Sequence, residues 1–227
     1  MADSKKSVNR FYLLIGVLLV AGAAALIYLG QRGPSMPVPV AVTVSASDTA
    51  GFAGYVLGSA DAPVEIMEFA DYQCPACQTF DMVEFPYVRD RLIATGRVRY
   101  VYRDFPLDQH NGARLAAHAA ACANDQGKYW EVHEAIYRTQ QEWSLATTSR
   151  IGSTFRDLTQ ATGVDMGIWD ECMQSLRYAG RIQASLEQGL RLGVNSTPSF
   201  VIGGSMYAEV MAYDRLRALV DSLSPTP

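Results

Sequence analysis

Cys74 and Cys77 are separated by two residues in the stretch EFADYQCPACQTF, which covers residues 68–80. A pair with this spacing can provide two ligands of a zinc site, close a small structural disulfide, or act as a redox couple that exchanges disulfides with other proteins. These three kinds of site need different neighbours. The rest of the chain therefore distinguishes between them.

The neighbours argue against a metal site and against a static disulfide. A structural zinc site needs four cysteine or histidine ligands, usually as two closely spaced pairs. The other two cysteines, Cys122 and Cys172, stand alone, and the three histidines do not have the spacing of ligands, so no metal is expected. A permanent Cys74–Cys77 disulfide would close a very small loop and remove little entropy from the unfolded chain. Redox exchange is the favoured interpretation.

The flanking residues place Cys74 at the start of a helix. Residues 62–70 (APVEIMEFA) predict a buried strand, and residues 75–95 have helical spacing with a kink expected at Pro86. Unpaired N–H groups and the dipole at a helix start stabilise a thiolate, which lowers the pKa of Cys74, while Cys77 lies one turn further and deeper. Because only the reduced form carries that thiolate, the disulfide form becomes an oxidant.

The remaining elements indicate an α/β domain that is interrupted by helices. Residues 97–105 (RVRYVYRDF) alternate as a second strand does, and residues 109–192 are almost entirely helical in pattern. Residues 197–204 (TPSFVIGG) return to strand, and an amphipathic helix is expected over 209–223. This order predicts one sheet with a helical insertion at about 109–192.

Residues 11–29 form an apolar stretch without charge, and we expect a transmembrane helix there. At 1.5 Å per residue it would span about 28 Å, close to the hydrocarbon thickness of a bilayer. The basic residues before it predict a cytoplasmic N-terminus over 1–10 and an exported remainder. A cleaved signal peptide is the alternative, but its apolar core is usually shorter and followed by a small-residue cleavage site. An uncleaved anchor is favoured.

Both alternatives place the chain from residue 30 onward in an oxidising compartment, where disulfides persist. Residues 30–51 contain three prolines and predict an extended tether, although the alternating valines from Val38 to Val44 would also fit an edge strand. The chain carries a net charge of −4, and residues 1–33 are basic, so the exported part is acidic. It has no basic face of the kind that binds nucleic acid.

The motif EFADYQCPAC, followed far downstream by GVNSTPSFVIGG, resembles the DsbA-like thiol-disulfide oxidoreductases of the thioredoxin superfamily. The likeness is closest to their membrane-anchored branch, which has a helical domain inserted in the thioredoxin fold. It extends from about Gly58 to Leu223. The resemblance implies an α/β thioredoxin-like domain over 52–227, preceded by one transmembrane helix.

The resemblance also implies roles for individual residues. Cys74 corresponds to the exposed nucleophile, and Cys77 to the cysteine that resolves the mixed disulfide. Thr197 and Pro198 correspond to a substrate-binding loop with a cis-proline that faces the pair. Glu68, six residues before Cys74, corresponds to a carboxylate that helps to move the proton of the buried thiol. An acid within a buried strand is unusual in any case.

The stretches AACANDQGKYWEVHEAIY and WDECMQSL match the helical insertion of the same family, in which two cysteines often pair. This implies a structural disulfide between Cys122 and Cys172. These residues are 50 positions apart, and closing such a loop contributes about 4 kcal/mol. Two separate buried thiols are the alternative.

By resemblance, the protein is expected to introduce disulfides into reduced exported proteins without a cofactor, and to be reoxidised by a quinone-linked membrane partner. Ala76 stands where the strongest oxidants of the family have histidine, so we expect a weaker oxidant that still exceeds a cytosolic thioredoxin. One alternative is a reductase or isomerase of the same fold. Another is an anchored module that uses a thioredoxin-like groove only for binding.

Overall fold

The computed structural model describes residues 13–25 and 36–224, which belong to two separate parts of the chain. In the first part, residues 13–25 form a helix whose side chains are exposed. None of the described helices has both the length and the apolar character needed to cross a bilayer. The expected cytoplasmic segment 1–10, the ends of the expected span 11–29 and residues 30–35 lie outside the described residues.

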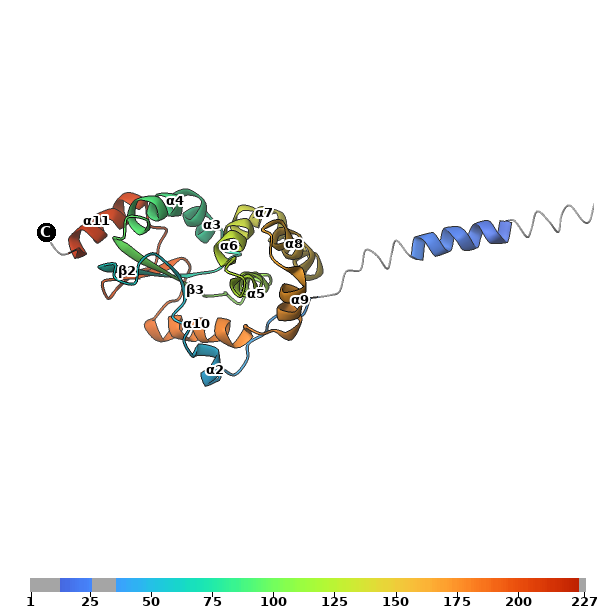
Figure 1. Ribbon diagram of the computed structural model, residues 1–227, viewed down its shortest axis with the longest axis horizontal. Helices are drawn as coiled ribbons and strands as arrows, with labels where there is room; N and C mark the ends of the chain where they lie inside the picture. The colour runs from blue at the N-terminus through green and yellow to red at the C-terminus, as the bar shows by residue number, and fades with distance from the viewer. Residues whose placement is uncertain (1–12, 26–35, 225–227) are drawn as a thin grey trace, which may run out of the picture. The chain divides into compact units, whose positions relative to one another are not determined.

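The second part is built on a five-stranded sheet with the strand order β1-β3-β2-β4-β5. The strands are β1 (Tyr55–Leu57), β2 (Val64–Ala70), β3 (Val98–Asp104), β4 (Ser199–Ile202) and β5 (Ser205–Tyr207). Only β2 and β3 pair in parallel, and the other neighbours are antiparallel. Both central strands are mostly buried, as expected when helices cover the two faces of a sheet. Figure 1 shows α4 and α11 on one side of the sheet and α10 on the other.

The helical region after the cysteine motif is continuous but irregular. It consists of α3 (Pro75–Thr79), a π-helical segment η1 (Phe80–Glu84), α4 (Phe85–Val88) and a second π-helical segment η2 (Arg89–Ile93). Pro86 lies in the first turn of α4 and has no N–H to donate to the preceding turn. The wider π turn before it accommodates the missing hydrogen bond. The kink expected at Pro86 therefore takes the form of a π-helical turn.

Six helices lie between β3 and β4, so the predicted sheet with a helical insertion is confirmed. They are α5 (Ala113–Asn124), α6 (Tyr129–Arg138), α7 (Gln140–Trp143), α8 (Thr148–Ala161), α9 (Met166–Ser175) and α10 (Ala179–Leu192). Helix α5 consists almost entirely of buried residues, many of them alanine, and it packs against α6, α8, α9 and α10. Helix α11 (Tyr213–Leu223) ends the described domain.

Residues 36–51, which the sequence assigns to an extended tether, contact the domain. Pro39 is buried, Met36 packs against the core, and residues 46–49 form the short helix α2 (Ala46–Thr49) beside α10. The Asp48 carboxylate accepts the Ser45 N–H at 2.7 Å, which stabilises this turn. The alternating valines do not form an edge strand.

Candidate active site

Cys74 lies at the junction between the central strand β2 and helix α3. It is the N-cap residue of α3, and Pro75 occupies the first turn, where a missing N–H costs nothing. Cys77 follows one turn later and is buried, with 1% of its surface exposed against 8% for Cys74. Both cysteines are free thiols in this structure. One sulfur is therefore at the surface edge of the site and the other beneath it.

The two thiols have opposite electrostatic environments. A hydrogen bond from the Cys77 thiol lowers the pKa of Cys74 from 9.0 to about 5, against the effect of burial. The Thr197 side chain and the N–H groups of Ala76 and Cys77 act in the same direction as Cys77. Burial, followed by the negative charge of Cys74, raises the pKa of Cys77 well above its usual value. At neutral pH, Cys74 is a thiolate and Cys77 a thiol. Such a pair has one nucleophile and one proton-bearing partner.

The loop before β4 faces the cysteines, and its Thr197–Pro198 peptide bond is cis. The antiparallel register between β2 and β4 pairs Phe69 with Ser199, which brings this loop to the end of β2 that leads to Cys74. The carbonyl oxygen of Thr197 lies 3.4 Å from the Cys74 sulfur. The buried Thr197 hydroxyl forms no hydrogen bond with the described residues, and Thr197 helps to lower the pKa of Cys74.

Glu68 lies within β2, and 3% of its surface is exposed. Its carboxylate accepts a hydrogen bond from the Tyr100 hydroxyl. Burial raises the pKa of Glu68 to about 8, and the nearby charges of Asp81 and Cys74 act in the same direction, whereas the Tyr100 bond opposes them. The charge of Glu68 also raises the pKa of Cys77. Glu68 is therefore an acid close to Cys77 that can exchange a proton near neutral pH.

Two polar side chains that the sequence analysis did not single out hold the loop before Cys74. The Gln140 amide, from α7, donates to the carbonyl oxygens of Tyr72 at 2.7 Å and Cys74 at 2.9 Å. The Asp71 carboxylate accepts from the Gln73 N–H and also from the Leu107 N–H, both at 2.7 Å. The Gln140 bonds and the bond between Asp71 and Leu107 join residues that are far apart in sequence, so no local spacing reveals them.

The same carboxylate also positions His110. The distance between Asp71 Oδ2 and His110 Nδ1 is 2.8 Å. This hydrogen bond raises the pKa of His110, and the negative charge of Cys74 contributes in the same direction. A protonated His110 would add positive charge near the thiolate, in a site where Ala76 has no polar side chain. The spacing of the histidines gave no signal for this arrangement.

A second buried histidine connects the helical insertion to the helix that carries Cys77. His133 of α6 contacts Asp81 Oδ2 through Nε2 and the Tyr72 hydroxyl through Nδ1, at 2.8 Å in both cases. Asp81 and His133 also line a hollow of about 360 Å³ between η1 and α6. The insertion therefore bonds to Tyr72 before the cysteine pair and to Asp81 after it.

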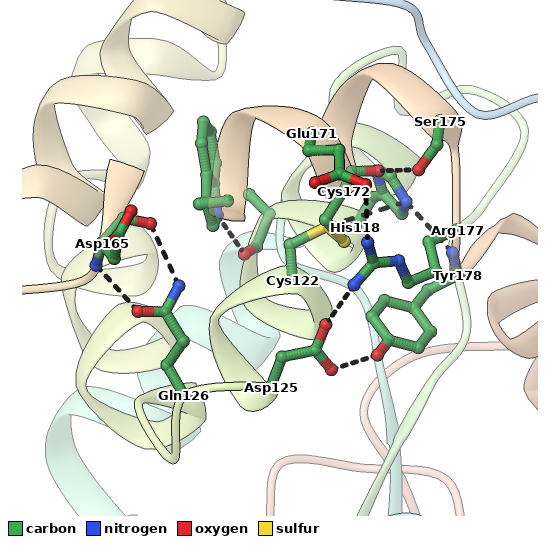
Figure 2. Close-up of a disulfide and its surroundings, with 12 residues drawn as sticks. His118, Cys122, Asp125, Gln126, Asp165, Glu171, Cys172, Ser175, Arg177 and Tyr178 are labelled. Atoms are coloured by element: carbon green, nitrogen blue, oxygen red, sulfur yellow. Dashed lines mark hydrogen bonds and ion pairs between the residues drawn. A yellow bond between two sulfur atoms is a disulfide. The ribbon is translucent and has the colours of Figure 1, made fainter. Parts of the chain in front are cut away.

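Cys122 and Cys172 form a disulfide with an S–S distance of 1.99 Å, which joins α5 to α9 (Figure 2). His118 lies beside it, with Nε2 3.9 Å from the Cys122 sulfur, and accepts the Tyr178 N–H. Burial lowers the pKa of His118 to about 4, so the ring is neutral at physiological pH. These two sulfurs and His118 make the one group of potential metal ligands among the described residues. Because the sulfurs are bonded to each other, they offer no thiolates.

Comparison with known proteins relates most of the chain to one family. A family model described as Thioredoxin matches residues 52–222. The chain is 32% identical over 169 residues to Na(+)/H(+) antiporter NhaA 3 of Salinispora tropica, which covers 74% of the chain and 24% of the antiporter. It thus spans about a quarter of the length of that relative. It is 25% identical to Disulfide bond formation protein D of Bacillus subtilis, which covers 73% of the chain and 75% of the relative.

A solved structure supports the same fold. The crystal structure of oxidised BdbD from Bacillus subtilis superposes with a TM-score of 0.67 at 22% sequence identity. The match covers 82% of this chain and 98% of BdbD.

Proposed function

The chain belongs to the thioredoxin family, as a DsbA-like thiol-disulfide oxidoreductase. We propose that it introduces disulfides into exported proteins through Cys74 and Cys77. The observation that supports this most strongly is the inequality of the two thiols. The pKa of Cys74 is lowered to about 5, whereas that of Cys77 is raised well above its usual value. A stabilised thiolate at Cys74 favours the reduced pair, so the oxidised pair readily gives its disulfide away.

The proposed reaction begins with the Cys74–Cys77 disulfide. A substrate thiolate attacks the Cys74 sulfur, and the sulfur of Cys77 leaves with the electron pair of the broken bond. A second substrate thiolate then attacks the substrate sulfur of the mixed disulfide and releases Cys74 as a thiolate. The substrate loses two electrons and gains a disulfide, while the cysteine pair gains both electrons. The low pKa of Cys74 makes it a good leaving group in this last step.

Glu68 is proposed to supply the proton that Cys77 needs. When Cys77 leaves, its thiolate forms in a buried place, where a negative charge is unfavourable. With a pKa of about 8, Glu68 is still largely protonated at neutral pH and can donate to that sulfur. It regains a proton when the pair is oxidised again.

The Thr197–Pro198 loop is proposed to hold the substrate. Its carbonyl oxygen beside Cys74 is a hydrogen-bond acceptor for the backbone of an extended peptide that carries the attacking thiol. Thr197 would then orient the peptide by strand addition, and Pro198 would keep the loop close to the sulfur. Recognition through the backbone suits an enzyme that acts on many sequences.

We further propose that residues 11–29 anchor the protein in the membrane, with residues 1–10 in the cytoplasm, residues 30–51 as the connection and residues 52–227 as the extracytoplasmic domain. Lys5, Lys6 and Arg10 before the apolar stretch support this orientation. The Cys122–Cys172 disulfide suits an oxidising compartment. Reduced exported proteins would be the substrates, and a quinone-linked membrane protein would restore the Cys74–Cys77 disulfide.

Direct transfer of a disulfide tests this function. The full-length oxidised protein is mixed with a reduced, unfolded secreted protein that contains two cysteines, and disulfide formation is followed by mass. We expect one substrate disulfide for each Cys74–Cys77 disulfide consumed. The Cys74→Ser variant should transfer none, and the Cys77→Ser variant should form no internal disulfide at this pair. Equal oxidation with the Cys74→Ser variant would rule out the proposed chemistry.

A further inference from the structure

A hollow of about 320 Å³ lies between α2, β3 and α10, on the side of the sheet that α10 covers. Figure 1 shows α2 next to α10 in this region. Three arginines line the hollow, Arg103 from β3 and Arg181 and Arg191 from α10, together with Phe52 and Ser185. We call this site the arginine hollow. None of the residues that line it is among those described around Cys74.

The spacing of the residues directs one side of α10 toward the hollow. Arg181, Ser185 and Gln188 follow one another at intervals of four and three residues, which places them on one face of the helix. Arg103 reaches the same space from the sheet and donates a hydrogen bond to Gln188. Basic side chains from a strand and from a helix therefore converge on a single volume.

Two of the three arginines in the hollow form no ion pair with the described residues, and the third forms a long one. Among the described residues, no carboxylate lies within ion-pair distance of Arg103 or Arg181, and Arg191 approaches Glu187 only at 3.9 Å. The Nε atoms of Arg103 and Arg181 are buried without a hydrogen-bond partner in this part of the chain. A buried N–H donor without an acceptor is costly, so these two Nε groups favour an added anion.

The guanidinium groups lie against aromatic rings instead. Arg181 stacks over Phe52 and Tyr178, at 4.2 Å from each ring centroid, and Arg103 lies 5.5 Å from the centroid of Phe52. Cation–π contacts position a cation without changing its charge. Two like charges against one ring repel each other, and an anion between them would remove that repulsion.

Ser185 supplies a neutral donor in the wall of the hollow. Only 1% of its surface is exposed, and its hydroxyl has no hydrogen-bond partner among the described residues. A serine inside a helix commonly donates to the carbonyl four residues earlier, and Ser185 does not. A ligand oxygen in the hollow would satisfy this hydroxyl.

The acids near the hollow do not replace such a ligand. The buried Asp104 carboxylate acts on Arg103 and Arg181 through its charge, yet neither of its oxygens forms a hydrogen bond with the described residues, and burial raises the pKa of Asp104 to about 7. Asp48 and Glu65 act on Arg181 and Arg103 through their charges without forming ion pairs with them. The Nε donors of Arg103 and Arg181 and the Ser185 hydroxyl remain without a hydrogen-bond partner among the described residues.

We propose that the arginine hollow binds a phosphate-class oxyanion, either free in solution or as part of a larger headgroup. A tetrahedral oxyanion presents several acceptor oxygens in different directions, so it can accept from Arg103, Arg181 and Ser185 together. A volume of about 320 Å³ equals the liquid volume of roughly ten water molecules, which leaves space for a substituent on the anion.

Titration calorimetry with inorganic phosphate tests the site on the full-length protein in a nonionic detergent. Arg181→Gln keeps the aliphatic stem of the side chain but removes the guanidinium group and its charge, and should weaken phosphate binding by about tenfold or more. Ser185→Ala removes one buried hydroxyl and should weaken it by about threefold to tenfold. Arg215→Gln is the matched control because Arg215 pairs with Glu209 on the surface, away from the hollow, and it should leave binding unchanged.

A second titration identifies the source of the anion. Glycerophosphoglycerol carries the phosphodiester of an anionic lipid headgroup without its acyl chains. Tighter binding of this compound than of phosphate indicates a lipid headgroup, and the reverse indicates a free anion. The proposal is overturned if neither compound binds at up to about 10 mM, or if the Arg181→Gln and Ser185→Ala variants both bind as the wild type does. Thermal unfolding without phosphate verifies that each variant is folded.

Discussion

Thr197 places two oxygen atoms near Cys74, and its hydroxyl can stabilise the thiolate whereas its carbonyl cannot. The hydroxyl is buried, without another partner among the described residues, and Thr197 lowers the pKa of Cys74. Replacing Thr197 by valine keeps the shape of the side chain and removes this donor. A hydrogen bond to a charged group contributes about 1.5–3 kcal/mol, so the pKa of Cys74 should rise by about one to two units.

The ultraviolet absorbance of the thiolate, measured as a function of pH, gives this value. Thr95→Val is the control, since the Thr95 hydroxyl bonds to backbone carbonyl oxygens of the preceding segment η2. An unchanged pKa in the Thr197→Val variant would mean that the hydroxyl does not support the thiolate.

Glu68 should make the stability of the protein depend on pH in an unusual direction. Its pKa is about 8 in the folded protein against 4.5 in the unfolded chain, so the folded state retains a proton that the unfolded state has lost. Stability is therefore lost as the pH rises from about 4.5 to 8, by up to about 5 kcal/mol. Glu68→Gln removes this titration and should be the more stable protein at pH 8.

Urea unfolding of both proteins at pH 5 and pH 8 measures the effect. The difference in the free energy of unfolding between the wild type and the Glu68→Gln variant should be smaller at pH 5 than at pH 8. Equal differences at the two pH values would show that Glu68 does not keep its proton when folded. The variant should also slow disulfide transfer, because Cys77 loses its proton donor.

At the scale of elements, one glutamine from the insertion fixes the strand-to-helix junction that presents Cys74. The Gln140 amide donates to two buried carbonyl oxygens of this junction. Gln140→Met keeps the size of the side chain and leaves both acceptors unsatisfied, which should destabilise the protein by about 2–5 kcal/mol. The adjacent Gln141 is exposed, so Gln141→Met serves as a matched control in the same urea titration. Equal stability of the two variants would show that Gln140 does not stabilise this junction.

The sequence predicted the elements whose signal is local and missed those that depend on distant partners. The strands near 64–70, 98–104 and 199–202 and the helical insertion follow from alternation and helical periodicity. The strand β1 was missed because it has three residues and is defined by its pairing with β3. The one-turn helix α2 was missed because the proline-rich stretch before it resembles a free tether, whereas its contact with α10 is tertiary.

The residues of the candidate site also divide into those with a local sequence signal and those that depend on distant partners. The Cys74–Cys77 spacing and the helix start could be read from neighbouring residues. The bond between Asp71 and His110 joins positions 39 residues apart, and Gln140 lies 66 residues from Cys74. A single sequence carries no pattern for such pairs. These bonds form only when the insertion folds against the sheet.

At the scale of the whole molecule, the Cys122–Cys172 disulfide should contribute to stability rather than to exchange. It closes a loop of 50 residues between α5 and α9. Replacing both cysteines by alanine should therefore cost about 4 kcal/mol in the free energy of unfolding. Disulfide transfer by Cys74 and Cys77 should continue in that variant while it remains folded. Loss of transfer in the folded variant would assign the second disulfide a part in the reaction.

The equilibrium reduction potential of the Cys74–Cys77 pair determines the direction in which electrons flow between this protein and its substrates. The full-length protein is equilibrated with mixtures of reduced and oxidised glutathione, and the pair is distinguished from Cys122–Cys172 by mass. A Cys74 pKa of about 5 lies between the thiol pKa values of thioredoxin and DsbA, so we expect a potential above about −200 mV. A potential near about −270 mV, the value of thioredoxin, would identify a reductase and contradict the proposed oxidase.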